Sequence, residues 1–159
     1  MNKLIIILLV VFYSMINASI AMAEEESLGQ YLYKNPDWVN EKSSLAFIGT
    51  RCAVIYTISL ERLKLNPNKK TEALISRLSS AGDVFATSVL ATSAELGVSE
   101  ENMLARTRFW SETYMEYSKK DWVKYNNIYQ GFVGEDLKTC SSAYPVFEKL
   151  IVKYGEQLK

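Results

Sequence analysis

Two groups of side chains in the C-terminal half of the chain have the chemistry that a functional site would need. The first is a pair of carboxylates, Glu112 and Glu116, which lie four residues apart. That spacing puts both groups on one face of a helix, where they could share general acid–base catalysis. By helical phase, however, both point away from the aromatic residues of the same segment, so a solvated helix surface is the simpler interpretation. We therefore predict no catalytic residue here.

The second group surrounds Asp121. A carboxylate among aromatic side chains needs hydrogen-bond donors or a counter-charge, because an unpaired buried charge is costly. Tyrosine hydroxyls, Arg106 or an arginine of another helix would meet that need, and the acid would then cap a local helix break or be a satisfied core residue. Alternatively, an open pocket would use it to hold a cationic or polyhydroxyl ligand. The candidate ligand-binding residues are Asp121, Tyr114, Tyr117, Trp122 and Tyr125.

The chain contains no histidine. This excludes Ser-His-Asp and Cys-His catalytic arrangements, H-E-x-x-H zinc sites, c-type haem attachment and Glu-x-x-His di-iron sites. The two phosphate-binding glycine motifs, G-x-x-x-x-G-K-[ST] and G-x-G-x-x-G, do not occur either. We expect no cofactor and no metal site, and a carboxylate-dependent hydrolase is the least favoured function.

The two cysteines of the chain, Cys52 and Cys140, each lie on an apolar helical stripe. In an oxidising compartment two buried thiols form a disulfide, and the alternatives are two free thiols or intermolecular pairing. The C-terminal stripe alternates steps of three and four residues, as in a helix that packs along a seam. Its members are Leu137, Cys140, Tyr144, Phe147, Ile151, Tyr154 and Leu158.

The N-terminus has the order of a secretory signal: Lys3, an apolar run from Leu4 to Ile16, and an A-x-A site ending at Ala23. Cleavage after Ala23 would leave a leader over residues 24–35 and a single helical domain over residues 36–159. An uncleaved anchor is the alternative, and polar residues in the second half of the segment argue against it. The sequence therefore predicts a periplasmic or secreted protein.

Turn and capping residues divide the remainder into four helices. We expect them over residues 36 to about 63, 67 to 96 with Gly97 as a left-handed cap, 99 to about 132, and 135 onward, with a turn at 131–134. Pro145 lies inside the last helix and is expected to kink it rather than split it. Helices of similar length joined by short turns favour an all-α, up-down-up-down four-helix bundle, with the first and last helices linked by one disulfide.

Two surfaces have more apolar area or less charge than one bundle requires. The first helix carries a second apolar row, Phe47, Val54 and Ile58, which is either covered by the leader or a neighbouring helix or forms the candidate interface. The second helix has an outer face with little charge. These surfaces favour a non-enzymatic binding or interaction module, whose partner is another protein or a second copy of the chain. The alternative function is a small-ligand carrier around Asp121.

The charge balance argues against two further classes of partner. Without the predicted signal the formal charge is minus one, so no basic excess indicates nucleic acid or anionic lipid. No segment after the signal is expected to be apolar for long enough to span a membrane, and stable membrane insertion after cleavage is not expected.

Overall fold

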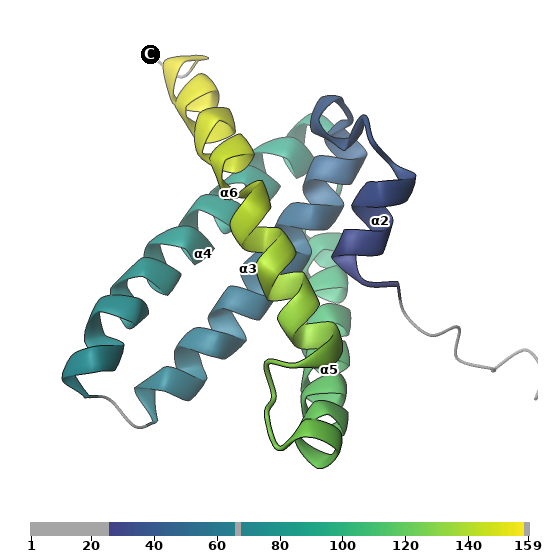
Figure 1. Ribbon diagram of the computed structural model, residues 1–159. Helices are drawn as coiled ribbons and strands as arrows, with labels where there is room; N and C mark the ends of the chain where they lie inside the picture. Colours follow the sequence, from purple (N-terminus) through teal and green to yellow (C-terminus); the bar gives the residue numbers. More distant parts are fainter. Residues whose placement is uncertain (1–25, 66–67, 158–159) are drawn as a thin grey trace, which may run out of the picture.

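The described part of the chain is all-helical (Figure 1). The computed structural model describes residues 26–65 and 68–157, so the predicted signal and its cleavage site lie outside the described residues. These residues form five α-helices and one short 3₁₀ helix. They are α2 (Leu28–Lys34), η1 (Trp38–Asn40), α3 (Lys42–Lys64), α4 (Lys69–Glu95), α5 (Glu100–Tyr125) and α6 (Gly131–Gln157).

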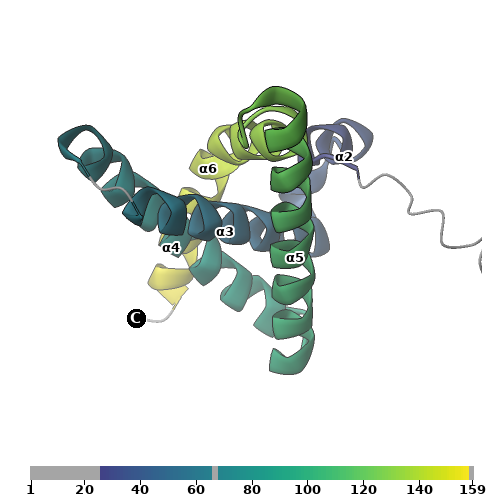
Figure 2. The ribbon, with the colours of Figure 1, turned by 90° about the horizontal axis from the view of Figure 1, so that it is seen from below.

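The hairpin of α3 and α4 is the centre of the fold (Figures 1 and 2). Most of α3 between Ser44 and Ser59 is buried on all sides, with Ile48 and Ile55 fully covered. Gly49 allows α4 and α6 to come close, because a Cβ atom there would lie 2.7 Å from a methyl group of Val89 and 3.0 Å from the ring of Phe147. Burial of these apolar surfaces is the main stabilising contribution to the fold.

One sequence expectation about α3 is wrong. Lys42–Lys64 is long and apolar enough, by length and composition, to cross a membrane. In the structure 67% of its most apolar window is buried. This is the pattern of a helix that lies in the core of a protein and is covered by its neighbours.

The other two long helices cross α3 instead of lying alongside it (Figures 1 and 2). The short helix α2 packs against α6, and its Leu28 side chain is fully buried in the core. The all-α prediction is confirmed, but the four-helix count is not, because α2 is a fifth helix. A seven-residue helix of this kind has no apolar periodicity that a sequence could show.

Several helix ends differ from the predicted ones. The first long helix begins at Lys42, because residues 38–40 form the separate turn η1. Helix α5 ends at Tyr125 rather than near residue 132, since Asn126 adopts a left-handed conformation with φ of 52° and its N–H bonds to the carbonyl of Trp122. Residues 131–134 are consequently the first turn of α6 and not a loop. The predicted caps at Gly97, with φ of 66°, and at Ser99 are both present.

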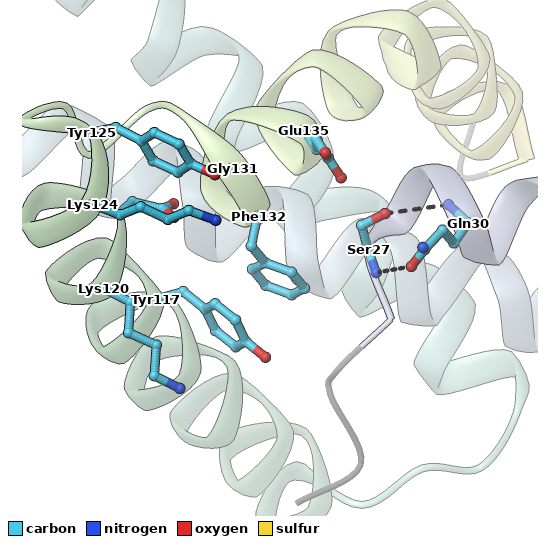
Figure 3. A pocket seen from close by; sticks show the side chains of 10 residues that line it. Ser27, Gln30, Tyr117, Lys120, Lys124, Tyr125, Gly131, Phe132 and Glu135 are labelled. Carbon is cyan, nitrogen blue, oxygen red and sulfur yellow. Dashed lines mark hydrogen bonds between the residues drawn. The ribbon is translucent and has the colours of Figure 1, made fainter.

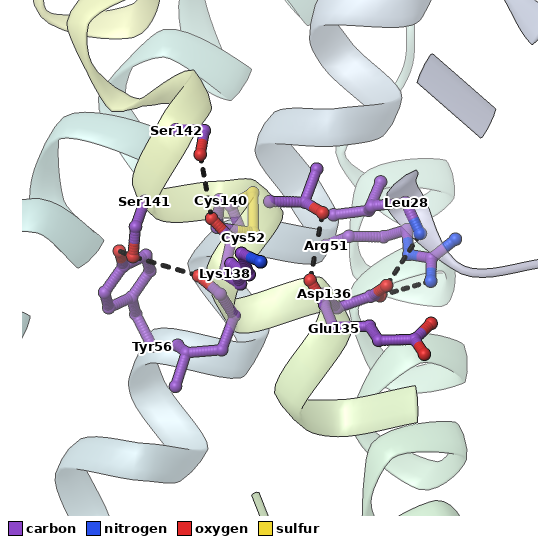
Figure 4. The surroundings of a disulfide bond; sticks show 12 residues. Leu28, Arg51, Cys52, Tyr56, Glu135, Asp136, Lys138, Cys140, Ser141 and Ser142 are labelled. Carbon is purple, nitrogen blue, oxygen red and sulfur yellow. Dashed lines mark hydrogen bonds and ion pairs between the residues drawn. A yellow bond between two sulfur atoms is a disulfide. The ribbon is translucent and has the colours of Figure 1, made fainter. Parts of the chain in front are cut away.

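A disulfide joins Cys52 of α3 to Cys140 of α6, as predicted (Figure 4). Both cysteines are fully buried, and their Cα atoms are 5.4 Å apart. Helix α6 is continuous across Pro145, so the proline does not split it. The seam of α6 therefore runs from the disulfide to Phe147, whose ring lies 4.8 Å from that of Phe85 of α4.

Candidate functional site

A buried ion pair, which the sequence analysis did not foresee, lies beside the disulfide (Figure 4). Arg51 of α3 pairs with Asp136 of α6, and both side chains are almost completely buried. The hydroxyl of Tyr114 of α5 donates to Asp136 Oδ2 at 2.5 Å and accepts a hydrogen bond from Arg51 Nε at 3.2 Å. Burial raises the pKa of Asp136, and the neighbouring Arg51 opposes that shift. The network therefore joins three helices through one charged cluster.

The same ion pair fastens the segment that leads into α2. Arg51 Nη1 donates to the carbonyl of Glu26 at 2.9 Å, and the N–H of Leu28 donates to Asp136 Oδ1 at 2.6 Å. The guanidinium carbon of Arg51 lies 3.9 Å from the centroid of the Trp110 ring, within the range of a cation–π interaction. With these contacts the polar groups of Arg51 and Asp136 are satisfied within the protein, so we assign the cluster a structural role.

An apolar groove of about 390 Å³ lies between α3, α4 and α5. Three of its threonines, Thr50, Thr57 and Thr107, donate their hydroxyls to the carbonyl four residues earlier in their own helices, at 2.8–3.0 Å. Their hydrogen-bonding capacity is thus largely used within the helix, and the groove is more apolar than its residue types suggest. It is lined by Thr50, Ala53, Val54, Thr57, Ile58, Ala86, Val89, Leu90, Glu100, Met103, Leu104, Thr107 and Ser111.

The three candidate interface residues have different surroundings. Val54 is buried and Ile58 is half-buried, and both line the groove. Phe47 lies elsewhere: its ring is 4.6 Å from that of Tyr31 of α2 and 5.7 Å from that of Trp110 of α5. The apolar row is therefore partly covered by the leader and by α5. The low-charge face of the second long helix contributes Ala86, Val89 and Leu90 to the groove.

A second, polar hollow of about 510 Å³ lies between the start of α2, the C-terminal half of α5 and the start of α6 (Figure 3). Three of the five candidate ligand-binding residues line it, namely Tyr117, Asp121 and Tyr125. Tyr114 belongs to the Arg51 cluster instead, and Trp122 is exposed and does not line this hollow. Its lining among the described residues is Ser27, Gln30, Tyr117, Lys120, Asp121, Lys124, Tyr125, Gly131, Phe132 and Glu135.

Asp121 is buried at the junction of α5 and α6. No helix break occurs there, since α5 is continuous to Tyr125. The carboxylate accepts one hydrogen bond, at 3.5 Å, from the N–H of Val133 in the first turn of α6. Burial raises the pKa of Asp121, and the Val133 N–H opposes this shift. Arg51, an arginine of another helix, pairs with Asp136 and not with Asp121.

The carboxylate pair considered for catalysis lies on the exposed side of α5. Both Glu112 and Glu116 are exposed, and Glu116 forms a surface ion pair with Lys120 at 2.8 Å. Within residues 26–65 and 68–157 no group of three or more acidic or cysteine side chains is arranged to hold a metal ion.

The sequence contained one signal for the Arg51 cluster and none for its partner. Arg51 is the single charge between Lys42 and Glu61 on an otherwise apolar helix, which marks it as unusual. Asp136 follows Glu135 near the predicted start of a helix, where acids are common because they favour the helix dipole. Nothing in the local sequence distinguishes a buried acid from an exposed one at that position.

No protein-family model, no curated protein and no solved structure matches this chain, so the chemistry of its own residues is the basis for assigning a function.

Proposed function

We propose that this protein is a non-enzymatic interaction module of an exported, oxidising compartment, and that it binds the apolar face of a helix from a partner protein. The binding surface is the groove between α3, α4 and α5. The observation that carries the proposal is that this groove is open and apolar, with its threonine hydroxyls bonded within their own helices. The buried disulfide supports the compartment, because disulfides persist where the environment is oxidising.

The exposed leucines of the groove support a protein partner. Leu90 of α4 and Leu104 of α5 both line the groove, and each is 60% exposed. Large apolar side chains that are exposed beside one another mark interaction surfaces more often than isolated ones do. Burial of these leucines on binding would contribute the apolar area that drives association.

The geometry and charge of the groove favour a helix with a basic residue as its occupant. The groove lies between helices, and the described residues contain no strand whose edge could pair with an extended peptide, so a helix in a groove is the matching mode of recognition. Among the described residues that line the groove, Glu100 is the one charged side chain, and Glu101 follows it in the first turn of α5. A lysine or arginine at one end of the apolar face of the partner would complement these acids.

The proposal is tested with a synthetic amphipathic peptide of about four helical turns, which carries leucines on one face and a lysine at one end. Its affinity is measured by fluorescence anisotropy against the unchanged protein, Leu90→Asp and Leu104→Asp. Each aspartate places a charge in the apolar groove, and we expect affinity to fall by about tenfold or more. Val123→Asp is the matched control, because Val123 is 85% exposed and lies outside the groove.

Two results would overturn the proposal. One is binding of the peptide that the control variant weakens as much as Leu90→Asp does. The other is a dimer of the unchanged protein, seen by sedimentation velocity, that Leu90→Asp dissociates; the groove would then bind a second copy and not a different protein.

A further inference from the structure

The polar hollow between α2, α5 and α6 contains groups of both charges (Figure 3). Asp121 and Glu135 supply carboxylates, and Lys120 and Lys124 supply ammonium groups. Lys124 and Glu135 both lie near enough to Asp121 to act on its pKa, the lysine lowering it and the glutamate raising it. A ligand in this hollow therefore meets a positive and a negative partner at the same time.

Asp121 has fewer donors than its oxygens can accept. It is 6% exposed and receives one long hydrogen bond, from Val133, whereas an ionised carboxylate has about four acceptor positions. Gly131 permits this arrangement, because a Cβ atom there would lie 2.5 Å from Asp121 Oδ1. An ammonium group has three donors and no acceptor, and it would complete the hydrogen bonding of this carboxylate.

Aromatic rings form one wall of the hollow. The rings of Tyr117 and Phe132 stack with their centroids 4.1 Å apart, and the ammonium group of Lys124 lies 4.9 Å from the ring centroid of Tyr125. Figure 3 shows Tyr117 and Lys124 reaching from α5 and Glu135 from α6, with Ser27 and Gln30 on the far side. The wall gives the apolar part of a ligand a surface to pack on.

We propose that this hollow is a binding site for a small zwitterion, a molecule of amino-acid size that carries an ammonium group, a carboxylate and an apolar side chain. The ammonium group donates to Asp121 and Glu135. The ligand carboxylate accepts from Lys124 and from Lys120, whose ammonium group also forms the ion pair with Glu116. The side chain of the ligand packs on Tyr117 and Phe132. The volume lies in the range of small-molecule sites, and this site is separate from the groove between α3, α4 and α5.

Three related probes distinguish a zwitterionic ligand from ligands that carry one charged group only. They are L-phenylalanine, phenethylamine, which lacks the carboxylate, and 3-phenylpropanoate, which lacks the ammonium group. Each is titrated into the full chain while the amide NMR signals of Gly131, Phe132 and Val133 are followed. We expect saturable shifts with L-phenylalanine. Affinity for each of the other two probes should be weaker by about tenfold or more, because each loses one charged hydrogen-bonding group.

Two variants test the role of Asp121. Asp121→Asn retains an acceptor for the Val133 N–H and should fold, which its thermal midpoint checks, but it should weaken L-phenylalanine binding about tenfold. Glu112→Gln removes an exposed carboxylate of the same helix outside the hollow and should leave affinity unchanged. The proposal is overturned if no probe gives saturable shifts, if phenethylamine binds as tightly as L-phenylalanine, or if the two variants weaken binding equally.

Discussion

At the scale of single residues, Arg51 connects more of the fold than any sequence pattern indicated. Its three guanidinium nitrogens donate to Tyr114, to the carbonyl of Glu26 and to Asp136, which belong to three different segments. A planar guanidinium can reach several acceptors in fixed directions, whereas a lysine ammonium acts as a compact point charge. The cluster thus specifies how α3, α5, α6 and the segment before α2 fit together.

Removing one partner of the Arg51–Asp136 ion pair should lower the stability of the fold. Arg51→Met would leave the carboxylate of Asp136 buried without its counter-charge, and we expect a loss of about 3–5 kcal/mol in the free energy of unfolding. The double variant Arg51→Met, Asp136→Leu removes both charges and should recover much of that loss. Chemical denaturation with the disulfide intact measures both. If the double variant is no more stable than the single one, the buried charge is not the cause.

The residue scale also shows where prediction from sequence stops. The pairing of Cys52 with Cys140 was predictable, because only one internal connectivity exists and both lie on apolar stripes. The sequence also indicated that a buried acid would need hydrogen-bond donors or a counter-charge, but it assigned that need to Asp121. Asp121 and Asp136 both lie near helix ends, and the packing of α3 against α6 brings Asp136, and not Asp121, to Arg51.

At the scale of elements, the junction between α5 and α6 depends on a glycine. Gly131 has φ of 66°, and a side chain there would also approach Asp121. Gly97, between α4 and α5, has the same φ but open space around it. Gly97→Ala should lower stability by about 1–2 kcal/mol through backbone strain alone, and Gly131→Ala by more.

Urea denaturation of the two variants makes this comparison directly. The difference between them isolates the close approach to Asp121 from the shared cost of the left-handed backbone. Equal losses at the two positions would contradict a packing role for Gly131.

Glu95 ends α4 and contacts the start of α3 and the last turns of α6. These contacts should make the free energy of unfolding depend on pH. Hydrogen bonds from Lys42, at 2.8 Å, and from the Tyr154 hydroxyl, at 3.0 Å, lower the pKa of Glu95. A carboxylate whose pKa is lowered by folding stabilises the protein above its unfolded-state pKa. That contribution is lost as the pH falls from the usual glutamate range through the lowered folded-state value.

This effect is measured as the difference in unfolding free energy between the unchanged protein and Glu95→Gln across the acidic range. The difference should be largest at neutral pH and shrink on acidification. Because Glu95 lies at the surface, added salt should reduce it. A difference that grows as the pH falls would show that Glu95 is not stabilised as the ion.

Helix positions were predictable from the sequence where local chemistry decides them, as at Ser99 and Gly97. They were not predictable where tertiary contacts decide. The aromatic residues after Tyr125 continue the helical pattern, yet Asn126 ends α5 in a left-handed conformation, and after the turn the N–H of Val133 in α6 bonds to Asp121. Tertiary contacts also explain why two of the five candidate ligand-binding residues do not line the hollow. Tyr114 points toward Arg51, and Trp122 points toward solvent.

At the scale of the whole molecule, two links hold α3 to α6 at the same level. Arg51 precedes Cys52 in α3, and Asp136 lies one helical turn before Cys140 in α6, so the ion pair and the disulfide are adjacent (Figure 4). The disulfide joins residues 88 positions apart and encloses all of α4 and α5. In the chain-entropy account, closing a loop of that length restricts the unfolded chain and contributes about 4–5 kcal/mol, generally less in practice.

Removing the disulfide should therefore destabilise the fold without abolishing the contacts around it. Cys52→Ser should lower the free energy of unfolding by up to about 4 kcal/mol and leave one titratable thiol at Cys140. The double variant Cys52→Ser, Cys140→Ser should lose a similar amount, because the same bond is absent from both. Adding Arg51→Met to the double variant should lower the free energy of unfolding by less than the same change does in the protein with its disulfide. Without the disulfide, α3 and α6 can separate enough for water to reach Asp136. Denaturation of the unchanged protein, Arg51→Met, the double cysteine variant and the triple variant tests this coupling; strictly additive losses would show that the two links act independently.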